Sequence, residues 1–196
     1  MQKILFSSNN KHKLDEVRSY FSDLPLQIVT PAEEGIYSKI EETGDTFEEN
    51  AILKSEGLYR LSGLPTFSDD SGFCIKQLGG NPGVYSARYG HEDFSDKERA
   101  EFLLKETANF TDRTAWFECV VAFSFGKQPV VFRGKCEGEL SLDYDETGSR
   151  FGYDPVFYFP PLQKRFSEIS KEAKNLISHR GQALKQFREY LEANYF

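Results

Sequence analysis

The sequence predicts an α/β fold (α+β by some definitions) with one long mixed sheet and flanking helices. Three observations predict this class. Helical spacing of apolar residues occurs in the first half of the chain and at its C-terminal end, strand-like runs fill the middle, and no repeat, linker or charge block divides the 196 residues. A chain of this length buries roughly 70% of its unfolded surface, so it needs no disulfide or structural metal. We therefore expect a single domain over residues 1–196.

Local signals predict the elements of the first half. Leu14, Val17 and Phe21 are spaced as on one face of a helix. Thr46 and Glu49 form a capping box, so a second helix should begin there. Its expected buried residues are Phe47, Ala51, Leu58 and Leu61. The expected elements are strands at 3–7 and 26–29 and helices at about 11–21 and 47–61.

Strand patterns dominate the second half. Residues 113–125 alternate so that one face of the strand is wholly apolar. The acidic segment 69–72 resembles the turn of a hairpin between strands at 66–68 and 73–78. Ser95 begins another capping box, and Ser178 should cap the last helix. The remaining expected elements are a loop at 79–83, strands at 129–136 and 139–144 in an antiparallel meander, a tight loop at 151–155, a strand at 156–159 and a C-terminal helix with Leu184, Phe187 and Leu191 on one face.

Composition and charge exclude several classes of protein. The chain has 31 acidic and 24 basic residues and a net charge of −7, which disfavours binding to nucleic acid or to an anionic membrane. No apolar run approaches the roughly 20 residues that a membrane helix needs. The three cysteines are widely spaced and form no CxxC motif, so neither a disulfide framework nor a zinc site is expected. Without a signal-like N-terminus, the chain fits a reducing cytoplasm.

A polar segment connects the first expected strand to the first helix. It consists of Ser8, Asn9, Asn10, Lys11, His12 and Lys13. Backbone amides at such a turn, together with the helix dipole, favour an anion. The hydroxyl, carboxamide and ammonium groups add donors for phosphate oxygens. Spacing alone is equally compatible with a phosphate site and with a loop of solvated lysines, and the segment contains no Walker motif.

Two acidic segments are candidates for a metal site. Asp69 and Asp70 are adjacent, and Glu41 and Glu42 lie upstream in a polar stretch. Neighbouring carboxylates raise each other's pKa unless a cation or donors share the site. Mg²⁺ prefers carboxylate oxygens and usually takes only one or two from the protein. An ordinary acidic turn remains the alternative. Lys54 either belongs to a solvated helix face or points towards Asp70.

A third group of residues combines an aromatic ring, a carboxylate and cations. The segment Phe151, Gly152, Tyr153 and Asp154 offers a ring that can stack on a base and a carboxylate that can accept from a ring N–H. Lys174 and Arg180 are candidate donors to a carbonyl oxygen. His179, considered alone, is more typical of a structural hydrogen bond than of a ligand.

Six segments in this order resemble the inosine triphosphatase family, the non-canonical purine nucleoside-triphosphate pyrophosphatases. They are SSNNKHK, EETGDTFEENAILK, FSDDSGF, LGGNPGVYSARY, FGYDPVF and EAKNLISHRGQALK, and they extend over residues 7–185. Chance matching of all six is implausible. The resemblance implies an elongated mixed sheet with flanking helices, two lobes around a central cleft, and a homodimer.

The resemblance also implies roles on the phosphate side. The family's phosphate-binding element falls on Ser8, Asn10 and Lys13, whereas Asn9 stands where bacterial members usually have glycine. Asparagine also tolerates a left-handed turn, so the loop should keep its shape. The metal-binding carboxylates fall on Glu41 and Asp70, with Glu42 as a one-residue alternative to Glu41. Asp70 is also the family's proposed general base, with Asp69 as the alternative, and Lys54 matches a phosphate-side lysine.

On the base side, the resemblance implies that Phe151 stacks on the purine. The residues that match the family's base pocket and its surroundings are Gly152, Tyr153, Asp154, Lys174, His179 and Arg180, and Ser71 joins the substrate contacts. The implied activity is Mg²⁺-dependent hydrolysis of purine nucleoside triphosphates (ITP, dITP, XTP) to the monophosphate and pyrophosphate, which removes deaminated purines from the nucleotide pool. Two alternatives remain: a nucleotide-binding sensor without hydrolysis, and a related pyrophosphatase acting on other modified nucleotides.

Overall fold

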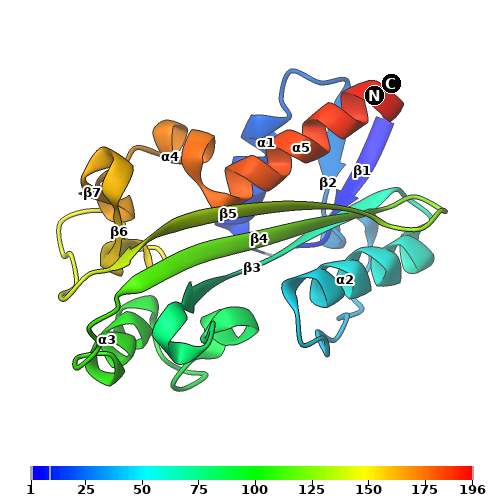
Figure 1. The fold of residues 1–196 in the computed structure, drawn as a ribbon. Coiled ribbons are helices and arrows are strands. Elements are labelled where there is room, and N and C mark those ends of the chain that lie inside the picture. Colours follow the sequence, from blue (N-terminus) through cyan, green and yellow to red (C-terminus); the bar gives the residue numbers. More distant parts are fainter. Residues whose placement is uncertain (1, 9, 196) are drawn as a thin grey trace. The chain divides into compact units, whose positions relative to one another are not determined.

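The structure is a computed structural model that describes residues 2–8 and 10–195, without the side chain of His12. Seven strands form one sheet in the order β2-β1-β3-β4-β5-β6-β7, with helices beside it (Figure 1). The strands are β1 Gln2–Phe6, β2 Leu26–Val29, β3 Thr66–Ile75, β4 Thr114–Ser124, β5 Val130–Leu140, β6 Phe157–Phe159 and β7 Lys164–Arg165. The α-helices are α1 Lys11–Tyr20, α2 Phe47–Ser62, α3 Asp96–Glu106, α4 Lys171–Ile177 and α5 His179–Asn194.

The sheet is mixed. Strand β1 pairs in parallel with β2 and with β3, where Phe6 lies opposite Phe67. Strand β5 pairs antiparallel with β6, where Leu140 lies opposite Phe157, and β6 pairs antiparallel with β7. The predicted α/β class, with a mixed sheet and flanking helices, is confirmed.

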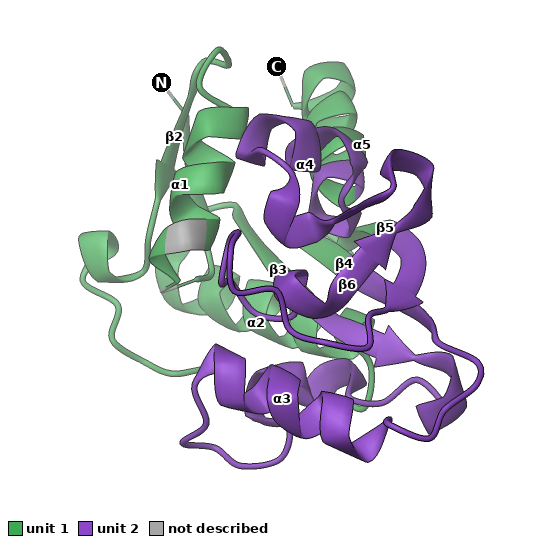
Figure 2. Cartoon of the chain, turned by 90° about the vertical axis from the view of Figure 1, so that its left-hand side faces the viewer, with its two compact units in different colours: residues 1–70, 120–133, 183–196 green, residues 71–119, 134–182 purple. Residues whose placement is uncertain are grey.

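The chain divides into two compact units (Figure 2). The first unit contains residues 1–70, 120–133 and 183–196, and the second contains residues 71–119 and 134–182. Three strands (β3, β4 and β5) pass from one unit into the other, and in β3 the boundary falls between Asp70 and Ser71. That these units are the two lobes of one domain stays a prediction.

In the first unit, neighbouring residues of β1 face opposite sides of the sheet, as strand geometry requires. Leu5 packs with Leu58 of α2. Phe6 instead stacks on Phe67, with ring centroids 4.7 Å apart, and Phe67 contacts Phe187 of α5 at 4.9 Å. Figure 1 shows α2 on one side of these strands and α5 on the other. Burial of each such phenylalanine stabilises the fold by about 1.5–3 kcal/mol.

The second unit has its own aromatic core. Phe73 stacks on Tyr153 with centroids 5.0 Å apart, and Phe117 is parallel to Phe166 at 5.8 Å. Phe157 meets Phe166 edge to face at 4.6 Å. These rings come from β3, β4, β6 and the segments beside them, so the core fixes Tyr153 within residues 151–154 and Phe157 shortly after them.

The predicted hairpin around residues 69–72 is wrong, because residues 66–75 form one continuous strand, β3. The acidic and glycine residues that suggested a turn lie within the strand, where Asp69 and Asp70 are buried next to lysines. The division predicted between strands at 129–136 and 139–144 is also wrong, because residues 130–140 form one strand, β5, and residues 141–144 lie beyond its end. A glycine is needed at position 138 of this strand, because a Cβ there would overlap the Tyr158 carbonyl oxygen of the adjacent β6.

The predicted capping boxes are confirmed. Thr46 and Glu49 cap α2 reciprocally, and Ser95 and Glu98 cap α3. Ser178 Oγ accepts from the Gly181 amide at 3.1 Å in the first turn of α5. The expected burial of Leu61 is wrong, because 53% of this residue is exposed. The short helix α4, which precedes α5, was not predicted.

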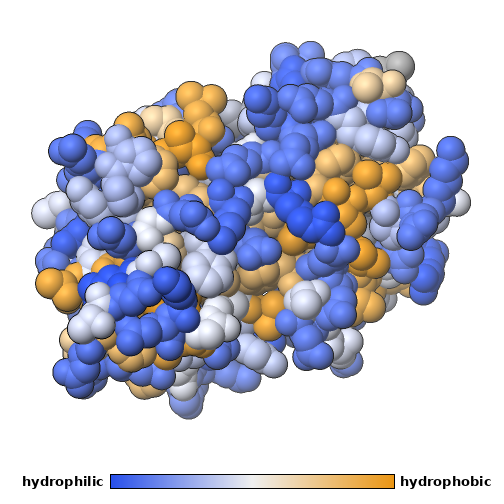
Figure 3. All heavy atoms as spheres, viewed as in Figure 1, coloured by the Kyte–Doolittle hydropathy of each residue, from blue (hydrophilic) through white to orange (hydrophobic). Residues whose placement is uncertain are grey.

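Polar and charged residues cover much of the face shown in Figure 3, with apolar residues gathered in patches between them. Within residues 2–8 and 10–195, no helix has the length and apolar character needed to cross a bilayer. Cys74, Cys119 and Cys136 are buried, and none of them forms a disulfide among the described residues.

Candidate active site

The two adjacent carboxylates of β3 face different helices. Successive side chains of a strand point to opposite faces of a sheet. Accordingly, Asp69 Oδ2 lies 2.8 Å from Lys13 Nζ of α1, and Asp70 Oδ1 lies 3.3 Å from Lys54 Nζ of α2. The side chains of Asp69 and Asp70 are only 3% and 13% exposed, so both carboxylates are held by lysines in a mostly dry environment.

Lys54 connects the strand to the acidic segment upstream. Its ammonium donates to the Asp69 carbonyl oxygen at 2.9 Å and lies 3.4 Å from Glu42 Oε1. Of the two interpretations of Lys54, the structure therefore supports the one that directs it towards Asp70. It is Glu42 that reaches Lys54, whereas Glu41 is exposed and makes no ion pair with any described residue.

The electrostatics of this cluster are set by burial and by its mixed charges. Burial raises the pKa of Asp70, and Glu42 and Asp69 raise it further, against the opposing effect of Lys54 and Lys13. Burial alone would lower the pKa of Lys54, but Asp70, Asp69 and Glu42 together raise it above its usual value. Asp70 is thus a more basic carboxylate than an exposed aspartate, beside a lysine that stays charged.

The same cluster fits a divalent cation. Asp70 Oδ2 is buried and has no hydrogen-bond partner among the described residues, and a buried carboxylate oxygen of this kind calls for a cation or a donor. No group of three or more His, Cys, Asp or Glu side chains in the described part of the chain is arranged to hold a metal. Mg²⁺ bound to a nucleotide usually takes only one or two protein carboxylates, so the cluster matches that mode of binding.

The loop before α1 is ordered by its own side chains. Ser8 Oγ accepts from the Asn10 amide at 3.2 Å, and Asn10 Oδ1 accepts from the Lys13 amide at 3.3 Å. Asn10 therefore caps α1, a structural role. Lys11 is exposed, whereas Lys13 is tied to Asp69. Two of the predicted contacts, Asn9 and the side chain of His12, lie outside the described residues.

The predicted base-side residues form a second cluster, within the second unit. Asp154 is 4% exposed and accepts a hydrogen bond from Lys174 of α4. The Lys174 ammonium lies 5.9 Å from the centre of the Phe151 ring, which is 37% exposed. Gly152, with φ of +55°, makes the left-handed turn between the ring and the carboxylate. The structure thus brings a ring, an acceptor and a donor together.

Three further predicted residues are largely buried around this cluster. Tyr153 lies in the core, where its hydroxyl donates to the Ser86 carbonyl oxygen at 2.8 Å. The His179 ring stacks on Phe117 at 4.8 Å. Arg180 donates to Ser71 Oγ at 3.1 Å, so these two predicted contacts do meet.

Two residues that the sequence analysis did not assign to the site hold its loops in place. Asp96 Oδ2 accepts from the Gly152 amide at 2.7 Å, across 56 positions of sequence. Asn50 Oδ1 accepts from the Gly44 amide at 2.8 Å, which fixes the acidic segment against α2. The only sequence signal for Asp96 is its place as an acidic residue in the first turn of a helix. This place indicates an interaction with the helix dipole and gives no indication of a contact with Gly152.

Comparison with solved structures places this fold. The chain has a TM-score of 0.90 with the Staphylococcus aureus Ham1 protein, at 41% identity over 98% of this chain and 99% of that one. A HAM1 protein from Coxiella burnetii gives a TM-score of 0.91 at 39% identity, over 98% and 100% of the two chains. The mixed sheet and its helices therefore define an α/β protein with the fold of these proteins.

Sequence comparison identifies the family. The model of the Ham1 family matches residues 4–190. A dITP/XTP pyrophosphatase of Leptospira biflexa is 45% identical over 190 residues, which are 96% of each chain. A dITP/XTP pyrophosphatase of Escherichia coli O157:H7 is 43% identical over 94% of this chain and 95% of its own. The chain belongs to the Ham1 family, and the family resemblance found in its sequence is confirmed.

Proposed function

We propose that this protein is a nucleoside-triphosphate pyrophosphatase that hydrolyses ITP, dITP and XTP to the monophosphate and pyrophosphate, with Mg²⁺ as its cofactor. The relatives named dITP/XTP pyrophosphatase support the reaction class. The observation that carries the proposal is the buried, unpartnered Oδ2 of Asp70 beside the ammonium group of Lys54. This combination suits a metal-bound polyphosphate, because the carboxylate serves the cation and the lysine serves the phosphates.

On the phosphate side, Asp70 and one of Glu41 or Glu42 would hold the metal. When bound, Mg²⁺ neutralises phosphate charge and braces the oxygens of an in-line transition state. Lys13 and Lys54 bind phosphate oxygens and offset the roughly four negative charges of the substrate. Asp70, or Asp69 beside it, orients a water molecule and removes its proton as it attacks the α-phosphorus. The raised pKa of Asp70 makes this carboxylate a better proton acceptor than an exposed aspartate.

On the base side, Phe151 stacks on the purine while Asp154 and Lys174 read its edge. Hypoxanthine and xanthine present an acceptor at O6 and a donor at N1–H, whereas adenine presents the reverse pattern. Asp154 can accept N1–H and still keep Lys174, because a carboxylate has about four acceptor positions. With ATP, buried polar groups would stay unpaired, which in other enzymes gives up to about 10⁴–10⁵-fold discrimination.

A pyrophosphate-release assay tests this function. ITP, XTP, dITP, GTP and ATP are compared with and without Mg²⁺, and the products are resolved. We expect monophosphate and pyrophosphate from ITP, dITP and XTP only when Mg²⁺ is present. Binding of ITP without turnover would instead indicate a nucleotide sensor, and a preference for modified pyrimidines would indicate a related pyrophosphatase.

We also infer that the protein acts as a homodimer in the cytoplasm, without nucleic-acid or membrane partners. The three buried thiols suit a reducing compartment, and the substrate pool is found there. Light scattering of the purified protein tests the dimer, since a monomeric mass at micromolar concentration would contradict it.

A further inference from the structure

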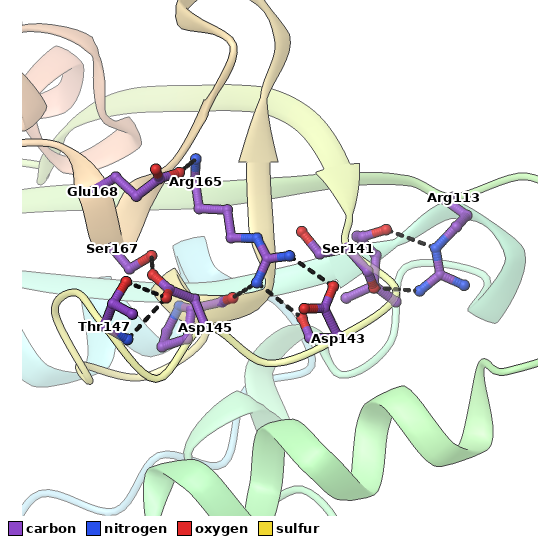
Figure 4. Close-up of polar contacts among 10 residues, drawn as sticks. Arg113, Ser141, Asp143, Asp145, Thr147, Arg165, Ser167 and Glu168 are labelled. Atoms are coloured by element: carbon purple, nitrogen blue, oxygen red, sulfur yellow. Dashed lines mark hydrogen bonds and ion pairs between the residues drawn. The ribbon is translucent and has the colours of Figure 1, made fainter.

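One arginine joins the two ends of the loop that carries the base-side residues. Arg165, in β7, donates from Nη1 to the carbonyl oxygens of Asp143 at 3.3 Å and of Pro155 at 3.4 Å. Its Nη2 donates to Asp143 Oδ1 at 2.7 Å. In Figure 4 the guanidinium of Arg165 points between these groups. Residues 143–155, which we call the reading loop, are therefore closed at their base by this side chain, together with the hydrogen bond from the Asp145 amide to the Pro155 carbonyl oxygen at 3.1 Å.

The reading loop is fixed a second time near its middle. Asp145 Oδ1 accepts from the Thr147 amide at 2.8 Å and from its hydroxyl at 2.6 Å, and Asp145 Oδ2 accepts from Ser167 Oγ at 2.6 Å (Figure 4). The Ser149 amide donates to the Ser167 carbonyl oxygen at 2.9 Å. Gly148 passes so close to Ser167 that a Cβ would overlap its backbone. Ser167 follows Arg165 by two positions, so one short segment holds both parts of the loop.

The strand that leads into the loop is anchored as well. Arg113 donates to the carbonyl oxygens of Leu140 and Ser141, each at 2.6 Å, at the end of β5 (Figure 4). The Arg165 amide donates to Glu168 Oε2 at 2.6 Å, which fixes the backbone of the arginine itself. Hydrogen bonds thus fix both the end of β5 and the backbone of Arg165.

Polar contacts are what order residues 145–150 of this loop, because this stretch contains no apolar side chain. Residues 145–150 are polar or glycine and are mostly exposed. A segment of this kind loses roughly 1–2 kcal/mol of conformational entropy for each residue that is ordered. Without the Arg165 contacts, the loop would lose this entropy when the purine binds, and the affinity for the nucleotide would fall accordingly.

We propose that Arg165 is a positioning residue that holds the reading loop in the geometry in which Phe151 and Asp154 recognise the purine base. This inference rests on the proposed function, in which those two residues read the base. The guanidinium of Arg165 contacts Asp143 and Pro155, so in this proposal it acts through the loop and not on the nucleotide. Its replacement should therefore affect the binding and selection of the nucleotide and leave the chemical step intact.

The test compares Arg165→Met with Lys164→Met. Both remove a cation from β7, but Lys164 is exposed and serves as the matched control. If the ordered loop population falls to about a tenth, KM for ITP rises roughly tenfold with kcat within about twofold of wild type. The ITP-to-ATP ratio of kcat/KM should narrow, and amide hydrogen exchange should speed up at Asp145 and Ser149. Lys164→Met should change none of these quantities.

Two further variants keep the result interpretable. Arg165→Gln retains an amide donor and should recover part of the wild-type KM. Ser167→Ala removes the contact to Asp145 alone and should act in the same direction, which covers the case in which Arg165→Met does not fold. An unchanged KM and selectivity in these variants, a loss confined to kcat, or an equal rise in KM for ITP and ATP would overturn the assignment. Wild-type protein without pyrophosphatase activity would instead count against the proposed function.

Discussion

Lys13 Nζ lies 2.8 Å from Asp69 Oδ2, so the first aspartate of the pair is neutralised by a lysine from α1. The second aspartate, Asp70, pairs instead with Lys54 of α2, which also lies beside Glu42. The two adjacent carboxylates thus have different charged neighbours. We propose that Asp70 takes the cation and the water, while Asp69 orients Lys13.

Replacement of the two aspartates separates these roles. Asp70→Asn should lower kcat by about 10²–10⁴-fold, as expected for loss of a positioned base, and should weaken Mg²⁺ binding. Asp69→Asn keeps the size of the side chain but frees Lys13, so KM should rise more than kcat falls. Steady-state kinetics and Mg²⁺ calorimetry measure the two effects separately. Near-normal turnover of Asp70→Asn would rule out its role as the base.

Asp154→Asn should narrow the preference for ITP over ATP by at least about tenfold. The amide offers one acceptor and one donor, so it no longer rejects the acceptor at N1 of adenine. The ratio of kcat/KM for the two nucleotides measures this change. Glu172→Gln on α4 makes the same chemical change at an exposed position and should leave the ratio as it is. An unchanged ratio in Asp154→Asn would remove this role.

Lys54→Met should destabilise the protein by about 3 kcal/mol at pH 7, because the buried Asp70 carboxylate then loses its counter-charge. Urea unfolding measures this loss. Lys39→Met, at an exposed position, should stay within about 0.5 kcal/mol of wild type. Equal effects of the two replacements would show that burial of Lys54 carries no energetic weight.

The buried thiols predict a pH dependence. Burial raises the pKa of both Cys74 and Cys136 to about 12. At pH 8 only about one in 10⁴ of these thiols is ionised, so native protein should not react with a disulfide reagent at these positions until it unfolds.

The sign of the stability change follows from the same values. An unfolded cysteine ionises near pH 8.5, whereas the folded thiols ionise only near pH 12. The contribution of these buried thiols to the free energy of unfolding is thus complete below about pH 8.5 and is lost as the pH rises towards 12. Urea unfolding at pH 8 and pH 10 should show lower stability at pH 10, with a smaller decrease in Cys74→Ala. A decrease of the same size in both proteins would contradict the assignment.

Periodicity and caps sufficed for most of the fold. Helices α1 and α2 and strand β4 lie within one or two residues of the positions expected from local patterns, and α3 begins at the cap expected at Ser95. The errors have tertiary causes. Asp69 and Asp70 have poor strand propensity, but pairing with Lys13 and Lys54 stabilises them in β3. No local pattern shows that a lysine of α1 and a lysine of α2 will lie beside this strand.

The candidate site was predicted only in part, because its contacts also join residues that lie far apart in the sequence. The partnership of Lys174 with Asp154, and that of Arg180 with Ser71, join residues that the sequence analysis had selected. The contact of Asp96 with Gly152 could not be foreseen, because neither residue type nor spacing specifies a pair so distant in sequence. Tyr153 was selected as a contact, but its hydroxyl is engaged within the core.

The alternation of Asp69 and Asp70 limits how the length of β3 can change. One residue added to β3 ahead of Asp69 would exchange the sides of the sheet that the two aspartates face, and so exchange their lysines. Insertions there would preserve the alternation only in pairs, and even a pair would displace each carboxylate along the strand. The number of residues in this strand is therefore as constrained as their identity.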